Sequence, residues 1–328
     1  METSELLKKV RKIEIKTKGL SNQIFSGEYH SAFKGRGMSF SEVREYAYGD
    51  DIKAIDWNVT ARFNTPYVKI FEEERELTVM LLVDVSRSSF FGTHGQMKNE
   101  MITEICAILA FSVINNNDKV GVIFFSHEIE KFIPPKKGKG HVLLIIRELL
   151  DFSYGEKSEQ LKPENLRKNK ETAKLSWWER LQNILKRPKP IDPKSNETDL
   201  EQALKYLSNV IKRRSTAFVL SDFMAKDYEK ALNLASRKHD LIGIRIFDPR
   251  EAELPNVGLA YMTDAETGQT MWLDTSSEAV RQHYAQRFEA NLEACKTAFA
   301  KGGADLVSIP TNDDYVKYLM NIFKKRGA

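Results

Sequence analysis

The sequence predicts an α/β protein with a doubly wound, mostly parallel sheet (a Rossmann-like arrangement) and a small β-rich N-terminal subdomain. From Thr78 onward, short apolar stretches alternate with longer stretches of helical periodicity, which is typical of a parallel sheet covered by helices on both faces. Residues 79–83 (VMLLV) are apolar at every position, as expected for a strand buried on both faces. Residues 27–74 instead consist of short segments separated by glycines, which favours a small β-rich unit.

The elements follow the chain in this order. Residues 4–13 (SELLKKVRKI) place apolar side chains at helical spacing and predict a short amphipathic helix. We therefore divide the chain into an N-terminal helix with the β-rich subdomain, residues 1–76, and a main domain, residues 77–328. In the main domain, strands are expected at residues 78–83, 119–125, 129–133, 216–220, 241–247 and 305–309, with a hairpin at 258–274. Helices are expected at residues 97–115, 141–152, 200–211, 228–238, 277–300 and 315–325.

Residues 153–196 interrupt this alternation, because lysine, arginine, glutamate and asparagine dominate there. Trp177 and Trp178 begin a short amphipathic island, and three prolines then end any helix. We interpret the segment as a charged insertion that is mobile in whole or in part. The island could be a partner-binding or membrane-surface helix, or could pack back on the domain.

Composition limits the classes of function. The chain has 328 residues, 41% hydrophobic and 29% charged, as in a soluble globular protein. A net charge of +4 gives no general argument for nucleic-acid binding. Cys106 and Cys295 lie in helical patterns and are expected to be buried thiols in a reducing compartment. The sequence has no apolar run long enough to span a bilayer and no signal-peptide core at its start. We expect a cytoplasmic protein, with peripheral membrane contact through a partner still open.

Oxygen side chains follow the buried strands where each strand is expected to end. Asp84, Ser86 and Ser88 follow the first strand, Thr198 precedes a helix, and Asp222 follows a later strand. In a doubly wound sheet these loops share one edge, so the five side chains could surround a single ion. Hydroxyls and carboxylates suit Mg²⁺ or Mn²⁺. No histidine or cysteine joins the set, which argues against zinc or iron.

Asp-x-Ser-x-Ser after a buried strand, then Thr198-Asp199-Leu200, then Ser221-Asp222, resembles the metal-ion-dependent adhesion site (MIDAS) of von Willebrand factor A domains, over roughly residues 76–325. The block upstream resembles the signature of bacterial domain-of-unknown-function family fifty-eight, in which a short β-rich region precedes an A-type domain. Its segments are FKGRGMSF (33–40), VREY (43–46), GDDI (49–52), IDW (55–57) and AR (61–62).

The resemblance implies a function without catalysis. In A domains the serines and the threonine tend to bind the metal directly, while the aspartates often act through water. The ion can then accept a carboxylate from a partner protein as its last ligand. Proteins of the second family are typically encoded beside MoxR-type AAA+ ATPases, so the resemblance implies an adaptor or co-chaperone that docks the ATPase or its client protein.

Structural alternatives remain for each candidate ligand. Asp84 could be an ordinary strand-end residue, and Ser86 and Ser88 ordinary turn residues. Thr198 and Glu201 form the pattern of a capping box, and a capping threonine could still face the ion. Asp222 could cap a helix or a turn.

The N-terminal block raises two further alternatives. Arg36, Arg44, Asp51, Asp56 and Arg62 could form a second site, but ion pairs that hold the β-rich unit to the main domain are favoured. Residues 34–37 (KGRG) lack the lysine and hydroxyl that end a phosphate-binding loop.

Two other functions also remain open. One is a metal-dependent hydrolase of phosphoesters using the same carboxylates, although no general base is evident beside them. The other is a membrane-associated scaffold that uses the N-terminal helix and the tryptophan island.

Overall fold

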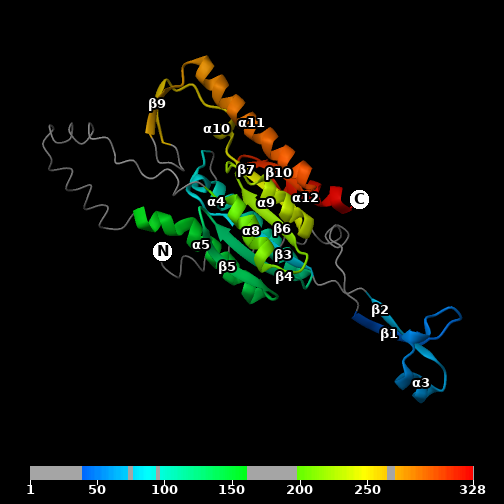
Figure 1. The fold of residues 1–328 in the computed structure, drawn as a ribbon. Helices are drawn as coiled ribbons and strands as arrows, with labels where there is room; N and C mark the ends of the chain where they lie inside the picture. The colour runs from blue at the N-terminus through cyan, green and yellow to red at the C-terminus, as the bar shows by residue number, and fades with distance from the viewer. Residues whose placement is uncertain (1–38, 73–76, 94–96, 161–197, 264–269, 328) are drawn as a thin grey trace.

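The computed structural model describes residues 39–72, 77–93, 97–160, 198–263 and 270–327 (Figure 1). The predicted helix at residues 4–13, the start of the family signature at 33–38 and the tryptophan island all lie outside the described residues.

The main domain is built on a six-stranded sheet with the order β10-β7-β6-β3-β4-β5. Neighbouring strands are parallel except for β5, which runs antiparallel to β4. This arrangement confirms the predicted doubly wound, mostly parallel sheet. The strands are β3 (Thr78–Asp84), β4 (Lys119–Phe125), β5 (Ile129–Lys136), β6 (Thr216–Ser221), β7 (Asp240–Phe247) and β10 (Asp305–Pro310).

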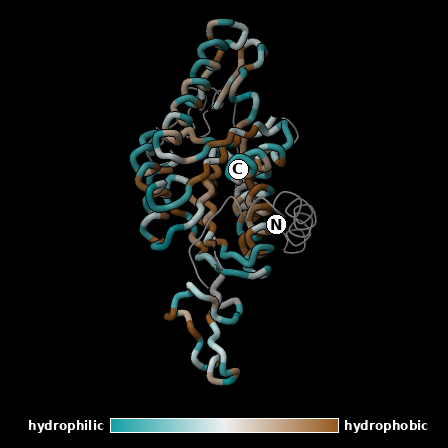
Figure 2. The backbone as a smooth tube through the Cα atoms, turned by 90° about the vertical axis from the view of Figure 1, so that its right-hand side faces the viewer, coloured by the Kyte–Doolittle hydropathy of each residue, from teal (hydrophilic) through white to brown (hydrophobic). Residues whose placement is uncertain are grey.

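Helices cover both faces of the sheet, and each layer encloses its own hydrophobic core (Figures 1 and 2). One face packs against α4 (Lys98–Asn115), α5 (Lys139–Gln160) and α12 (Tyr315–Gly327). The other face packs against α8 (Leu200–Val210), α9 (Glu229–Lys238) and α11 (Glu278–Gly302).

Strand β3 lies at the centre of the sheet and contributes to both cores. Val79, Leu81 and Val83 face the core under α4, whereas Met80 and Leu82 face the core under α8. All five are buried, and burying one such side chain stabilises the fold by roughly 1.5–3 kcal/mol. The apolar run is uninterrupted because the strand is buried on both faces, as the sequence predicted. This burial fixes the position of Asp84 at the end of the strand.

Helix α5 is longer than predicted, because it continues to Gln160 instead of ending at residue 152. Its Ser153 belongs to the packed domain, since its carbonyl accepts from Asn99 Nδ2 at 3.1 Å and its hydroxyl lies 3.1 Å from Thr103 Oγ1. The predicted start of the insertion at residue 153 is therefore wrong. The following residues are mostly good helix formers with no proline to stop the helix. Residues 161–196 of the insertion lie outside the described residues.

The β-rich N-terminal unit has β1 (Ser39–Glu45) paired antiparallel with β2 (Tyr67–Glu72). It also has two helical elements that were not predicted, η1 (Ile52–Ala54) and α3 (Trp57–Phe63). The side chain of Asp56 starts α3, because it accepts from the backbone N–H groups of Asn58 and Val59.

The prediction that ion pairs hold the β-rich unit to the main domain is wrong for the described residues. Arg44 pairs with Asp50 at 2.7 Å and Lys69 with Asp56 at 3.5 Å, both inside the unit. Asp51 accepts from the backbone of Lys53. Among the described residues, no ion pair runs from these side chains to the six-stranded sheet or its helices. Arg36 lies outside the described residues.

The remaining elements follow β7. A short helix, α10 (Pro249–Ala252), precedes the predicted hairpin, which is formed by β8 (Leu259–Thr263) and β9 (Thr270–Asp274). Cys106 and Cys295 are buried and free, as predicted. Within the described parts of the chain, no helix is long and apolar enough to cross a membrane.

His239 gives the fold a measurable pH dependence. It is buried just before β7, and its Nδ1 lies 2.9 Å from Ser215 Oγ. Its Nε2 has no hydrogen-bond partner in the part of the chain that the structure describes. Burial, with a smaller effect from Lys238, lowers its pKa to about 4. Because the unfolded chain then binds the proton more tightly, stability is lost as the pH falls from about 6.5 to 4.

We therefore expect the free energy of unfolding of His239→Gln, relative to that of the wild type, to rise by about 2 kcal/mol when the pH is lowered from 7.5 to 5. Urea unfolding at the two pH values measures this difference. Glutamine does not titrate and can keep the bond to Ser215. His283→Gln on the exposed side of α11 is the matched control and should follow the wild type at both pH values. Parallel stability curves for His239→Gln and the wild type would contradict the prediction.

Candidate metal centre

The candidate centre lies at the point where the strand order of the sheet reverses. Strands β4 and β5 lie on one side of β3, while β6, β7 and β10 lie on the other. At the carboxyl end of β3 stands Asp84, and at the carboxyl end of β6 stand Ser221 and Asp222. In open α/β sheets the crevice at this reversal is where ligands bind.

Asp84 is almost fully buried, with 1% of its surface exposed. Its Oδ1 accepts from the backbone N–H of Ser86 at 2.9 Å, and its Oδ2 accepts from Ser221 Oγ at 2.6 Å. Asp84 therefore has a structural role at the end of its strand, as the sequence left open, because it accepts from the turn at Ser86. This role does not neutralise the carboxylate, because both donors are uncharged. Within the described part of the chain, no lysine, arginine or histidine pairs with Asp84.

Two serine hydroxyls connect Asp84 with Asp222. Ser86 Oγ lies 3.0 Å from Ser88 Oγ, and the Ser88 side chain hydrogen-bonds to Asp222. Ligands held about 2.1 Å from Mg²⁺ at right angles lie about 3 Å apart, which is the spacing of these hydroxyls. The structure thus brings four of the predicted ligands into one group of oxygen atoms.

Thr198, the fifth predicted ligand, is buried at the same edge of the sheet. The backbone N–H of the next residue, Asp199, donates to the carbonyl of Ser126 at 2.8 Å. Ser126 follows Phe125, which pairs with Asp84 across β3 and β4. The Thr198 loop is therefore tied to the end of the strand beside Asp84.

The structural alternative for Thr198, that it is the N-cap of the helix, is not what the structure shows. Helix α8 begins at Leu200, so Asp199 is its N-cap and accepts from the backbone N–H of Gln202 at 2.8 Å. The Glu201 side chain pairs with Lys205 at 2.8 Å. An aspartate adjacent to the helix start serves as the cap equally well.

Lys98, the first residue of α4, is a member of the site that sequence reasoning missed. Its Nζ lies 3.0 Å from Asp222 Oδ2 and 2.6 Å from Glu251 Oε1, and only 1% of its side chain is exposed. Burial disfavours its charged form, but the charges of Asp222 and Glu251 outweigh burial and raise its pKa. No local sequence signal separates this lysine from a surface lysine.

The carboxylates of Asp84 and Asp222 differ in the charges that surround them. Burial, followed by repulsion from Asp222, raises the pKa of Asp84 to about 6. Burial also acts on Asp222, but Lys98 and the Ser88 hydroxyl lower the pKa of Asp222 below its usual range. Asp222 therefore has a cation beside it, whereas Asp84 is a buried carboxylate with no cation among the residues that the structure describes. Buried charges in proteins are normally paired or bound to a metal.

Arg245 supports the Asp222 loop from beneath. Its Nε donates to the backbone carbonyl of Asp222 at 3.1 Å, and its guanidinium lies over the Phe288 ring at 4.5 Å. It is buried, and no described residue hydrogen-bonds to its Nη1. A signal for this residue was available, since it is the one charged side chain in the apolar strand segment 241–247 (LIGIRIF).

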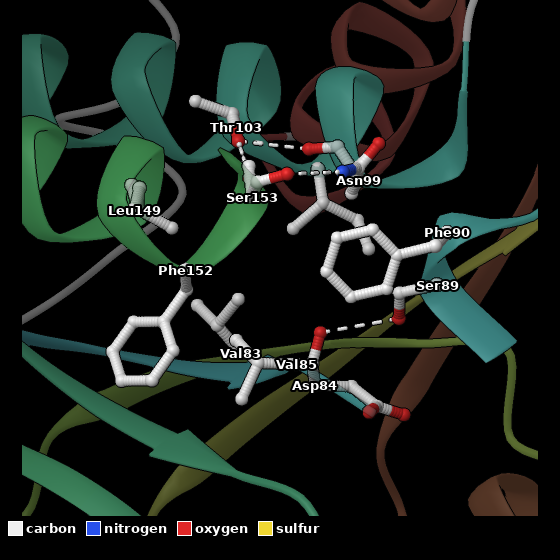
Figure 3. Close-up of a pocket in the computed structure, with 11 residues that line it drawn as sticks. Val83, Asp84, Val85, Ser89, Phe90, Asn99, Thr103, Leu149, Phe152 and Ser153 are labelled. Carbon is white, nitrogen blue, oxygen red and sulfur yellow. Dashed lines mark hydrogen bonds between the residues drawn. The ribbon is translucent and has the colours of Figure 1, made fainter. Parts of the chain in front are cut away.

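A small pocket lies behind the site loop, between β3, α4 and α5 (Figure 3). Ser89 Oγ points toward it and donates to the backbone carbonyl of Asp84 at 3.3 Å. The carboxylate of Asp84 points away from Thr103 and Ser153 on the far wall of the pocket. The pocket is therefore on the opposite side of the loop from the carboxylate, and Ser89 does not belong to the oxygen cluster.

The donor set fits a hard divalent ion bound largely by hydroxyl groups. In the described parts of the chain, no three His, Cys, Asp or Glu side chains gather closely enough to hold a metal by themselves. An ion held here by Asp84 and Asp222 would need the oxygens of Ser86, Ser88 and Thr198 as well, a set that suits Mg²⁺ or Mn²⁺.

The fold and the site together define a doubly wound α/β protein. Its carboxylates and hydroxyls cluster where the strand order of the sheet reverses. The chain belongs to the family described as Protein of unknown function DUF58, which it matches over residues 42–294. That match includes the N-terminal unit from residue 42 onward and all five predicted ligands.

The chain is also similar to several individual proteins and solved structures. The chain is 24% identical over 331 residues to Uncharacterized protein Rv1480 of Mycobacterium tuberculosis, covering 100% of this chain and 92% of that protein. It is 28% identical to Uncharacterized protein YeaD of Bacillus subtilis, over 33% of this chain and 25% of that protein. Among solved structures, it is similar to BatB from Bacteroides thetaiotaomicron, with a TM-score of 0.41 and 15% identity, covering 76% of this chain and 98% of that one. It is also similar to the SpRpn10 VWA domain, with a TM-score of 0.35 and 12% identity, over 75% and 95% of the two chains.

Proposed function

We propose that this protein is a metal-dependent interaction module that binds a carboxylate of a partner protein through a divalent ion. The ion is Mg²⁺ or Mn²⁺, held by Asp84, Ser86, Ser88, Thr198 and Asp222. The observation that supports this most directly is Asp84, a buried carboxylate beside Asp222 that has no cation among the described residues. A bound divalent ion would supply the missing charge.

The ligand types explain why such an ion would bind a partner. Three of the five ligands are neutral hydroxyls, and Asp222 already shares its charge with Lys98. The ion therefore keeps part of its positive charge, and a carboxylate from outside can complete its coordination by a charge-assisted contact.

The partner we propose is a MoxR-type AAA+ ATPase or its client protein, with this chain as adaptor or co-chaperone. Support for this part comes from the family resemblance, in which such ATPases are encoded nearby. We propose no catalytic step, because among the described residues none beside the cluster stands out as a general base for a water molecule.

Ion binding alone is the first test, measured by titration calorimetry with Mn²⁺. We expect Ser86→Ala to weaken binding by about tenfold or more, because one of the few direct ligands is lost. Ser89→Ala is the matched control, since its hydroxyl lies in the same loop but bonds to the carbonyl of Asp84. If Ser86→Ala and the wild type bind Mn²⁺ with equal affinity, Ser86 is not a ligand of the ion.

Partner binding is the second test. The purified MoxR-type ATPase from the same organism should be retained by the immobilised wild-type chain in Mg²⁺ and released by excess EDTA. Ser86→Ala should retain much less of it, and Ser89→Ala a normal amount. Retention that is indifferent to EDTA and to Ser86→Ala would refute the proposed mode of docking.

A further inference from the structure

We propose that Lys98 competes with the divalent ion for Asp222 and sets the ion affinity of the centre, with Glu251 as the position to which it withdraws. This inference rests on the proposed function, because it concerns the same ion. It adds a residue to the centre that acts on the ion through Asp222 instead of binding it.

Placing the charged ammonium of Lys98 at this buried position is electrostatically unfavourable, so it needs carboxylate partners. Its ammonium is buried at the first residue of α4, where the positive end of the helix dipole disfavours a cation. Two carboxylates compensate for this, one from the loop after β6 and one from α10.

The ammonium of Lys98 is bonded to a carboxylate oxygen of Asp222 that the ion would also bind. Its Nζ lies 3.0 Å from Asp222 Oδ2, while Asp222 Oδ1 accepts from the backbone N–H of Met224 at 3.2 Å. Both oxygens of Asp222 are thus engaged within the protein. An ion that approaches Asp222 directly or through a water must displace one of these contacts, and the ammonium is the one that repels it.

Glu251 is placed to hold Lys98 after that displacement. Its Oε2 accepts from the backbone N–H of Asp248 at 3.0 Å, as part of the capping box that starts α10. Its Oε1 lies 2.6 Å from Lys98 Nζ, closer than Asp222 does. Glu251 is therefore fixed independently of the lysine, and the flexible lysine side chain can leave Asp222 without losing its nearer partner.

The charges of the cluster also suit a divalent ion. Asp84, Asp222 and Glu251 with Lys98 leave two net negative charges when all are ionised, which one divalent ion balances. Removing the lysine would make the centre more acidic, so it would bind the ion more tightly and repel an incoming carboxylate more strongly.

The test measures Mn²⁺ affinity by titration calorimetry in Glu251→Gln and in Lys98→Met/Glu251→Gln. Glu251→Gln keeps the capping acceptor but leaves Lys98 only Asp222, so we expect affinity to fall by about threefold to tenfold. The double variant has the same net charge as the wild type without the competing ammonium, so we expect about tenfold tighter binding. Lys296→Met on α11, whose lysine pairs with exposed Glu293, is the control and should bind as the wild type does.

The two variants must shift the affinity in opposite directions, which a loss of structure would not produce. Double-variant binding equal to or weaker than that of the wild type overturns the role of Lys98, while the ion site itself stands. If the wild type binds no Mn²⁺, both the proposed function and this inference fail together.

Discussion

Asp84→Asn is expected to stabilise the ion-free protein and to abolish its stabilisation by Mn²⁺. In the wild type, Asp84 is buried beside Asp222, and no cation in the described ranges of the chain pairs with it. Replacing a buried charge by an amide of the same shape removes the repulsion and most of the desolvation cost. We expect a gain on the order of 2 kcal/mol in the free energy of unfolding at pH 8 in EDTA.

The order of stability should reverse when the ion is added. A ligand that binds only the folded state adds about 2.7 kcal/mol at a concentration one hundred times its Kd. The wild type should gain this amount in Mn²⁺, whereas Asp84→Asn should gain little. Urea unfolding of both proteins, with Mn²⁺ and with EDTA, measures the four free energies needed.

Asp199→Asn is the matched control for the loss of an acidic residue at this edge. Asparagine caps a helix as well as aspartate does, so α8 should be unaffected. The variant should keep the full response to Mn²⁺. An equal Mn²⁺ response in Asp84→Asn and the wild type would show that Asp84 is not part of an ion site.

The parts of the structure that could be predicted are those fixed by local pattern. The apolar run before Asp84 determines a central strand, and strand–helix alternation determines the edge at which Asp84 and Asp222 meet. These depend on side-chain burial and on the parallel connection of strands, and the sequence displays both.

The parts that could not be predicted depend on contacts between distant residues. Lys98 meets Asp222 and Glu251, which are 124 and 153 positions away in the chain. The burial of a lysine is decided by the packing of three separate elements and leaves no local pattern. The N-cap of α8 was missed for a different reason, because Thr198 and Asp199 are both good caps and only the exact helix start separates them.

Lys98→Met is expected to lower the free energy of unfolding of the ion-free protein by about 3–5 kcal/mol. Removing one partner of a buried ion pair leaves the other charges uncompensated, which costs more than the pair contributed. Here Asp222 and the less buried Glu251 would both lose their cation, and Asp84 would add its repulsion when ionised. Urea unfolding in EDTA measures this loss, and Lys205→Met, which removes an exposed pair on α8, should change stability by less than about 0.5 kcal/mol.

The same variant should recover much of its stability in Mn²⁺, because a divalent ion beside Asp222 replaces the charge that the lysine supplied. Recovery larger than the Mn²⁺ gain of the wild type would show that lysine and ion act on the same carboxylate. Glu251→Gln added to Lys98→Met should also restore part of the loss in EDTA, since it removes a like charge next to Asp222. If neither Mn²⁺ nor the second substitution changes the stability of Lys98→Met, the lysine stabilises α4 by packing alone.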